Sequence, residues 1–227
     1  MPTPNLKLLA IACVLAATQA RAEDVTFTGF AHGSETVDFA LSYPDASLNR
    51  SGSTSAGGFL TVLNGGPAFE SYCVDLYQYI SFGTTYHDYT LPGTTHVFTN
   101  ASDYADLSKL YARAGVVDTS MKEAAFQIAA WEIAFDTSTV YTATSLSDGT
   151  ATFSGGTAAT SGALALATTW LTTLDSAGPG PGIAVLQSPG EQDVMTPVPE
   201  PEIYALMLAG LGAMGFVARR RRARTAP

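Results

Sequence analysis

The side chain with the greatest chemical potential in this sequence is the thiol of Cys73, in the segment Tyr72-Cys73-Val74-Asp75. The second cysteine of the chain, Cys13, lies in an N-terminal segment that we expect to be removed. A single cysteine left in an exported protein either pairs with another chain or has a special thiol. Free cysteines are also often buried as small apolar residues, so the thiol needs a chemical partner before it indicates a function.

The histidines offer this thiol little support as a catalyst. A hydrolase would need a base within hydrogen-bond reach, and His87 and His96 are the candidates. Both lie in the Thr-rich residues 84–99, which we expect to form a loop, and His32 lies in a turn. The sequence shows no hydrolase signature, metal-ligand spacing or phosphate loop. We therefore expect no enzyme, no metal site and no cofactor.

The residues around the cysteine have the pattern of β structure. Residues 25–30 and 35–41 alternate apolar and polar side chains, and a further strand is expected at 59–63. Residues 45–58 are rich in Ser, Gly and Asn and predict a loop. The aromatic and β-branched stretch 69–82 favours a strand, which would hold the cysteine.

After these strands the spacing of apolar residues becomes that of helices. Residues 103–114 place apolar side chains three or four positions apart, which predicts a helix. A second helix is expected at 120–135, where Ser120 and Glu123 have the spacing of a capping box. A third is expected at 162–174.

The order of these elements predicts the fold class. A closing strand at 183–186 follows the helices, and residues 191–197 lead into the C-terminal segment. Strands followed by helices predict an α+β fold, here a β-sandwich or barrel with a helical insertion. A C-terminal hydrophobic anchor helix completes the prediction.

The N-terminus has the layout of a secretory signal peptide. Lys7 precedes an apolar run at 8–17, and Ala20-Arg21-Ala22 offers the small side chains that signal peptidase accepts. The apolar run is too short to span a bilayer. We therefore assign residues 1–22 to a signal peptide that signal peptidase removes.

The C-terminus contains three elements in a fixed order. The motif Val198-Pro199-Glu200-Pro201 precedes the apolar residues 203–218, and a basic cluster follows: Arg219, Arg220, Arg221, Arg222 and Arg224. As a helix the apolar segment is about 24 Å long, shorter than the roughly 30 Å hydrocarbon core of a bilayer. Arginines after a span belong on the cytoplasmic side, so the domain before it faces outward.

This order resembles the PEP-CTERM sorting signal of Gram-negative bacteria, over residues 198–224. The resemblance implies recognition by an exosortase, cleavage near the Pro-Glu-Pro motif, and delivery to the cell surface or to an exopolysaccharide matrix. The apolar helix would then be a transient anchor in the inner membrane. An ordinary tail anchor is the alternative.

Residues 23–197, between the two ends, have the length of one domain. They contain 18 acidic and four basic residues, a net charge of −14. Such acidity opposes binding to nucleic acid, whose phosphates need basic partners. We expect a single acidic exported domain with no nucleic-acid partner.

Two short motifs of this domain resemble those of a thioester domain, a family known mainly from surface proteins of Gram-positive bacteria. Tyr72-Cys73-Val74 matches its aromatic-Cys-apolar motif, and Gln127-Ile128-Ala129-Ala130-Trp131 matches its Gln-x-Ala-apolar-Trp helix. The resemblance implies that Cys73 and Gln127 form an internal thioester, with Tyr72 and Trp131 packed around it. It covers most of residues 23–197, although only these two motifs are sharp.

The residue types suit this chemistry. A thiolate can attack the Gln127 carboxamide carbon and expel ammonia, and the resulting thioester is an electrophile. An amine on a ligand could then displace the sulfur, which would make adhesion covalent. Burial near Trp131, Tyr72 and Phe126 would shield the bond from water.

Two other functions fit the sequence. A passive matrix protein would contact extracellular polysaccharide through its Ser, Thr, Gly and acidic surface, and would need no thioester. A thiol hydrolase would use Cys73 with His87 or His96, and its turnover would depend on the histidine.

Overall fold

The structure is a computed structural model that describes residues 22–91 and 98–198 together with Leu211 and Met214. The strands in this part of the chain are β1 (Ala22–Phe30), β2 (Glu35–Leu41), β3 (Arg50–Ala56), β4 (Phe59–Leu63), β5 (Ala68–Cys73), β6 (Thr85–Thr90), β7 (Ala151–Ser154), β8 (Gly182–Leu186) and β9 (Val194–Val198). The helices are α1 (Asp103–Ala114), α2 (Ser120–Phe135), α3 (Gly156–Ser161) and α4 (Ala163–Thr172).

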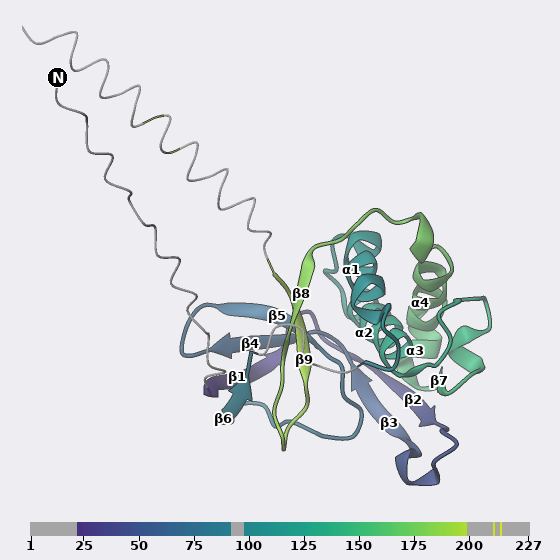
Figure 1. Cartoon of the computed structure of the whole chain (residues 1–227), viewed down its shortest axis with the longest axis horizontal. Helices are drawn as coiled ribbons and strands as arrows, with labels where there is room; N and C mark the ends of the chain where they lie inside the picture. Colours follow the sequence, from purple (N-terminus) through teal and green to yellow (C-terminus); the bar gives the residue numbers. More distant parts are fainter. Residues whose placement is uncertain (1–21, 92–97, 199–210, 212–213, 215–227) are drawn as a thin grey trace, which may run out of the picture.

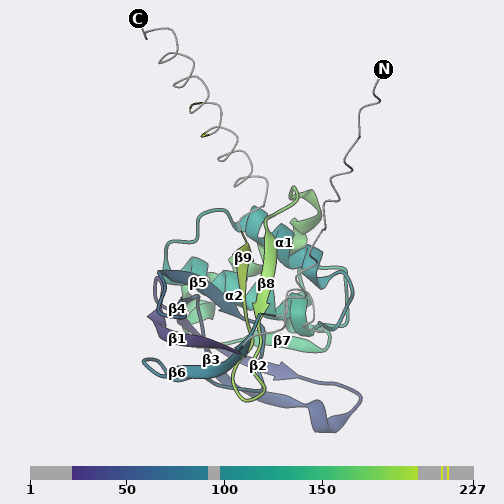
Figure 2. The same cartoon turned by 60° about the vertical axis from the view of Figure 1, so that its left-hand side comes forward.

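The strands form two antiparallel sheets that make a curled half-barrel. The larger sheet has the strand order β6-β1-β4-β5-β9-β8, and the smaller has the order β3-β2-β7. Helices α1, α2 and α4 gather on one side of β8 and β9, and α2 packs against both of the others (Figure 1). In the rotated view α2 lies behind β8 and β9 (Figure 2). The predicted combination of β-sheets with inserted helices is confirmed in this coarse form.

The centre of the larger sheet positions Cys73. Strands β4 and β5 pair as a hairpin, and in its turn Asn64 and Gly65 have φ values of 51° and 68°. Asn and Gly tolerate this left-handed conformation better than other residues, which makes the tight reversal possible. Strand β5 ends at Cys73, which pairs with Val194 of β9. The cysteine therefore lies at the C-terminal end of a central strand, where β5 pairs with β9.

Helix α2 is buried from Glu123 to Phe135. Its N-cap is Thr119, whose hydroxyl accepts a hydrogen bond from the Lys122 N–H at 3.3 Å. The Glu123 side chain does not return to the helix terminus, because the adjacent strands and turns offer it three hydrogen-bond donors inside the protein. The predicted capping box from Ser120 to Glu123 is therefore wrong.

The exposed strands are the elements that the sequence analysis misses. Residues 45–58, predicted as a loop, contain β3, and residues 84–99 contain β6. Both strands are exposed along most of their length, so no alternation of apolar side chains marks them. They form because β2 and β1 offer them a backbone edge to pair with.

Three further differences have the same origin. The strand predicted at 69–82 ends at Cys73, and residues 191–197 contain most of β9. Strand β7 and helix α3 lie in a Ser, Thr and Gly-rich stretch with weak local signals. Pairing with β5 and β8 decides that β9 forms, and pairing with β2 decides that β7 forms.

Several predictions fall outside the described residues. These are residues 1–21 of the predicted signal peptide, most of the predicted anchor helix 203–218, His96, the motif residues Pro199, Glu200 and Pro201, and the arginine cluster. Val198 is the last residue of β9. Within the part of the chain that the structure describes, no helix is long and apolar enough to cross a membrane.

Candidate functional site

The structure places Cys73 and Gln127 side by side, at the contact between β5 and α2. The Cys73 N–H donates to Gln127 Oε1 at 2.9 Å, and Gln127 Nε2 donates to the Cys73 carbonyl at 2.7 Å. Both residues are buried, with exposed fractions of 1% and 0%. The two hydrogen bonds hold the carboxamide in one orientation beside the residue that carries the thiol.

The thiol itself is held by the backbone of the segment after β5. Cys73 Sγ lies 2.6 Å from the Asp75 carbonyl, to which the thiol donates, and 3.3 Å from the Asp75 N–H. Burial raises the pKa of the Cys73 thiol to about 12, although the Asp75 N–H and the Trp131 side chain act in the opposite direction. At neutral pH the group is therefore a neutral thiol.

Tyr72 and Trp131, the aromatic residues of the two sequence motifs, are both buried in the core. The Tyr72 ring packs on Phe126, with centroids 4.2 Å apart, and the Trp131 ring stacks on Phe153 at 6.1 Å. The buried indole N–H of Trp131 has no hydrogen bond of ordinary geometry among the described residues, but it is near enough to lower the pKa of the Cys73 thiol. The Tyr72 ring thus packs on the residue before Gln127, and Trp131 lies beside the thiol.

A pocket of about 220 Å³ reaches the cysteine. Its lining includes Cys73 and Trp131 together with the aromatic side chains of Phe59, Tyr79 and Phe82. Tyr79 is 68% exposed and Phe82 is 43% exposed, whereas Cys73 is buried. The pocket therefore extends from aromatic residues at the surface to the thiol.

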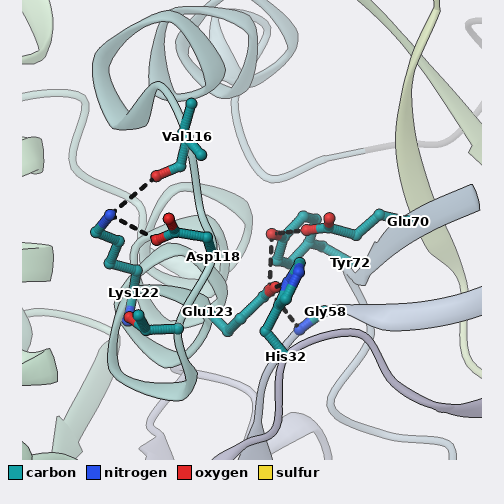
Figure 3. Close-up of polar contacts among 9 residues, drawn as sticks. His32, Gly58, Glu70, Tyr72, Val116, Asp118, Lys122 and Glu123 are labelled. Carbon is teal, nitrogen blue, oxygen red and sulfur yellow. Dashed lines mark hydrogen bonds and ion pairs between the residues drawn. The ribbon is translucent and has the colours of Figure 1, made fainter.

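A second polar cluster lies at the N-terminal end of α2 (Figure 3). Glu123 Oε1 accepts from His32 Nδ1 at 2.6 Å, and Glu123 Oε2 accepts from the Gly58 N–H at 3.0 Å and from the Tyr72 hydroxyl at 2.8 Å. The same Tyr72 hydroxyl also contacts Glu70 Oε1. The Glu123 hydrogen bond raises the pKa of His32, and burial raises the pKa of Glu70. The cluster touches the Cys73 segment through Tyr72.

Sequence analysis misses Glu70 and Glu123 as members of a site and places His32 only in a turn. One signal in the sequence could have found Glu123. It lies four residues before Gln127, so both side chains lie on the same face of a helix that is otherwise rich in alanine and large apolar residues. A charged residue on such a face needs partners from elsewhere in the fold.

The histidine that the hydrolase alternative requires lies elsewhere. His87 is on the edge strand β6, its side chain is 73% exposed, and its Nδ1 pairs with the Asp24 carboxylate at 2.8 Å. The described polar contacts of the Cys73 thiol involve Asp75 and Trp131. The structure thus does not bring His87 into contact with the thiol.

Helix α2 carries another buried acid at its opposite end. Glu132 Oε2 is buried and has no hydrogen-bond partner among the described residues. Burial and the nearby Asp136 charge raise the pKa of Glu132 to about 9. Glu132 and Asp136 line a pocket of about 230 Å³. The rest of its lining consists mostly of residues with hydroxyl side chains: Ser138, Thr142, Thr144 and Ser145.

Comparison with known proteins identifies the C-terminal segment. Residues 197–222 match the PEP-CTERM protein-sorting motif. The chain carries a PEP-CTERM sorting signal. This signal implies that the protein is exported, passes through a transient membrane-anchored step and is processed by an exosortase. The prediction made from the order of the C-terminal elements is thereby confirmed for the sorting signal.

Two other comparisons concern the whole chain. The N-terminal domain of the Streptococcus pyogenes pilus tip adhesin Cpa is similar in structure, with a TM-score of 0.44 and 13% sequence identity. The similarity covers 82% of this chain and 97% of that domain. A search of curated proteins found no match.

Proposed function

We propose that the exported domain forms an internal thioester between Cys73 Sγ and Gln127 Cδ, and that it uses this bond to attach covalently to an amine-bearing ligand at the cell surface or in an exopolysaccharide matrix. The observation that carries the proposal is the pair of hydrogen bonds between the Gln127 carboxamide and the Cys73 backbone. The sorting signal supports the extracellular setting in which such attachment would be useful.

The hydrogen bonds suit the first chemical step. Cys73 Sγ attacks Gln127 Cδ, the S–C bond forms as the C–N bond breaks, and the nitrogen takes the thiol proton and leaves as ammonia. Negative charge develops on Gln127 Oε1 during the attack. The Cys73 N–H already donates to this oxygen and would stabilise that charge, as an oxyanion hole does.

Burial favours the neutral product of this step. A charged thiolate is costly here, because burial raises the pKa of the Cys73 thiol. A thioester carries no charge and therefore avoids that cost. The aromatic side chains around the pair would also limit hydrolysis by excluding water.

The pocket and the charge of the domain suit the second step. An amine that enters beside Tyr79 and Phe82 can reach the thioester, where its nitrogen attacks Gln127 Cδ and the sulfur leaves as the Cys73 thiol with the amine proton. An amide bond to the ligand remains. The excess of acidic residues attracts ammonium-bearing ligands before the reaction.

The proposal is tested by the intact mass of the full chain, purified in mild detergent, before and after methylamine treatment. We expect a mass one ammonia below that of the unreacted chain, then addition of one methylamine at Gln127 together with a newly reactive Cys73 thiol. Cys73→Ala and Gln127→Ala should show neither change. Gln78→Ala is the matched control, because Gln78 bonds to the Pro189 carbonyl away from the pair and should leave the reaction intact.

The opposite result would be a wild-type chain of unreacted mass with no methylamine adduct. In that case the passive matrix protein is the better description, and Cys73→Ala would retain association with the matrix. With a working thioester, Cys73→Ala would abolish covalent attachment. Turnover that is lost on replacement of His87 or His96 would instead favour the hydrolase.

A further inference from the structure

The polar cluster at the N-terminal end of α2 combines three side chains that commonly bind metals. His32 comes from the turn between β1 and β2, Glu70 from β5 and Glu123 from the beginning of α2. One ligand atom from each lies within 4.8 Å of the other two. Figure 3 shows the three side chains converging near the Tyr72 hydroxyl.

The two contacts that Tyr72 makes with the carboxylates of this cluster share a single hydroxyl proton. The Tyr72 hydroxyl contacts both Glu123 Oε2 and Glu70 Oε1, but it has a single proton and can donate it to only one carboxylate. The other oxygen-to-oxygen contact needs a proton on Glu70 or a cation between the groups. Two carboxylates brought this close repel each other unless one of these conditions is met.

The absence of a side chain at Gly58 leaves room for the Glu70 and Glu123 carboxylates to approach each other. A Cβ atom added to Gly58 would lie 2.5 Å from Glu123 Oε2 and 3.0 Å from Glu70 Oε1. Only a glycine therefore fits against both groups without displacing them. The two acids share one small space beside the Gly58 N–H.

A further polar group near the cluster has no partner. The Tyr111 hydroxyl is buried and makes no hydrogen bond with a described residue. The Tyr111 ring packs edge-on against the Tyr72 ring, with centroids 6.1 Å apart, which places Tyr111 beside the cluster. A metal-bound water would give this buried hydroxyl a partner.

We propose that His32, Glu70 and Glu123 form a binding site for a divalent transition-metal ion of the Zn²⁺ type. An imidazole with two carboxylates is a ligand set that suits Zn²⁺, whereas Mg²⁺ and Ca²⁺ prefer oxygen ligands alone. His32 Nδ1 and Glu123 Oε1, which now share a proton, would both face the ion once that proton is released. The His32 side chain is 44% exposed, so the ion can enter from solvent.

The site would tie together the elements that hold the Cys73 and Gln127 pair. Tyr72 precedes Cys73 on β5, and Glu123 lies one helical turn before Gln127 on α2. A bound ion would therefore fix the spacing between strand and helix and stabilise the folded domain by its binding free energy. The inference does not require that the thioester forms.

The test is a titration of the full chain, purified in detergent without a polyhistidine tag and stripped of metal with a chelator. We expect saturable binding of one Zn²⁺ per chain by calorimetry and a higher melting temperature with Zn²⁺ than with Mg²⁺. His32→Ala should weaken Zn²⁺ binding by about tenfold or more. Even the loss of a residue that only hydrogen-bonds to a metal ligand lowers metal affinity by about that factor. Circular dichroism verifies that this half-exposed substitution leaves the fold intact.

Two control variants make the result specific. His87→Ala removes a histidine that pairs with a single carboxylate at the surface, that of Asp24. This variant should bind Zn²⁺ as the wild type does. Cys73→Ala tests whether the thiol captures the ion, and it should also retain binding. The inference is overturned if the wild type shows no saturable binding, if His32→Ala binds as tightly as His87→Ala, or if Cys73→Ala abolishes binding.

Discussion

The two ends of helix α2 bury the same type of residue in different surroundings. Glu123 receives hydrogen bonds from His32, the Gly58 N–H and Tyr72. Glu132 lies nine residues later, is equally buried, and has an Oε2 without a partner among the described residues. Burial and the charge of Asp136 raise the pKa of Glu132 to about 9, so this acid is protonated at neutral pH.

The difference teaches that burial alone does not decide the role of a carboxyl group. The N-terminal end of α2 packs against the β1–β2 turn, the β3–β4 connection and strand β5, each of which supplies a donor, whereas the C-terminal end faces a pocket with hydroxyl side chains. A partnered carboxylate stabilises the contact between helix and sheet. An unpartnered one costs free energy unless it keeps its proton.

Replacing each acid with glutamine is the sharpest test of this comparison. Glu123→Gln should lower the free energy of unfolding by about 3 kcal/mol, because hydrogen bonds to a charged group are the stronger ones and donors lose their acceptor. Urea unfolding at neutral pH, followed by tryptophan fluorescence, measures the change. An equal loss in Glu132→Gln would show that the two ends do not differ.

The second largest effect should be on the pH dependence of the free energy of unfolding, to which Glu132 contributes and which Glu132→Gln should reduce. The pKa of Glu132 is about 9 in the folded protein and near its ordinary value of 4.5 when unfolded. Folding therefore takes up a proton between these values, and the stability of the wild type falls as pH rises through this range, by at most about 1.4 kcal/mol per pH unit.

Glu132→Gln should thus gain stability relative to the wild type by about 2 kcal/mol between roughly pH 5 and pH 6.5. Urea unfolding of both proteins at several pH values measures the difference, in which the titration of all other groups cancels. A difference that stays constant with pH would mean that Glu132 is ionised in the folded protein.

Gly58→Ala should disturb the contacts of Glu123 at the N-terminal end of α2 without changing any charge. Its Cβ would lie 2.5 Å from Glu123 Oε2, so the carboxylates must shift, at a cost of about 1.5 kcal/mol for overpacking. Gly178→Ala is the matched control, since a Cβ there meets no atom within 4 Å. Thermal unfolding of the two variants should separate them, and equal melting temperatures would contradict the convergence of the acids at Gly58.

Tyr72→Phe should have the smallest effect of the series. It removes the hydroxyl that links Glu70 and Glu123 and keeps the ring on Phe126, so a loss of about 1 kcal/mol is expected. A double-mutant cycle with Glu123→Gln measures how much of this loss depends on the shared contact. Full additivity would show that Tyr72 and Glu123 do not act together.

Local patterns in the sequence predict the elements that have an apolar face. Strands β1 and β2 alternate apolar and polar residues, β4 is a short and mostly apolar segment, and α1 has the helical period, so each element is visible without its neighbours. Strand β3 is polar and mostly exposed, and β6 is polar apart from its two tyrosines, so pairing with β2 and β1 is what makes them strands. A backbone edge supplied by a distant segment leaves no trace in the paired residues.

The candidate site divides in the same way. The sequence by itself determined that one cysteine lies between the predicted signal peptide and the sorting signal, that Cys73 and Gln127 stand in recognisable motifs, and that the tail has its three parts in order. Only the tertiary structure decided that the Gln127 carboxamide bonds to the Cys73 backbone, and that Glu123 meets His32 and Glu70 while Glu132 Oε2 meets no partner among the described residues. Motifs are local in the chain, whereas hydrogen bonds to a buried polar group depend on which distant segments pack against it.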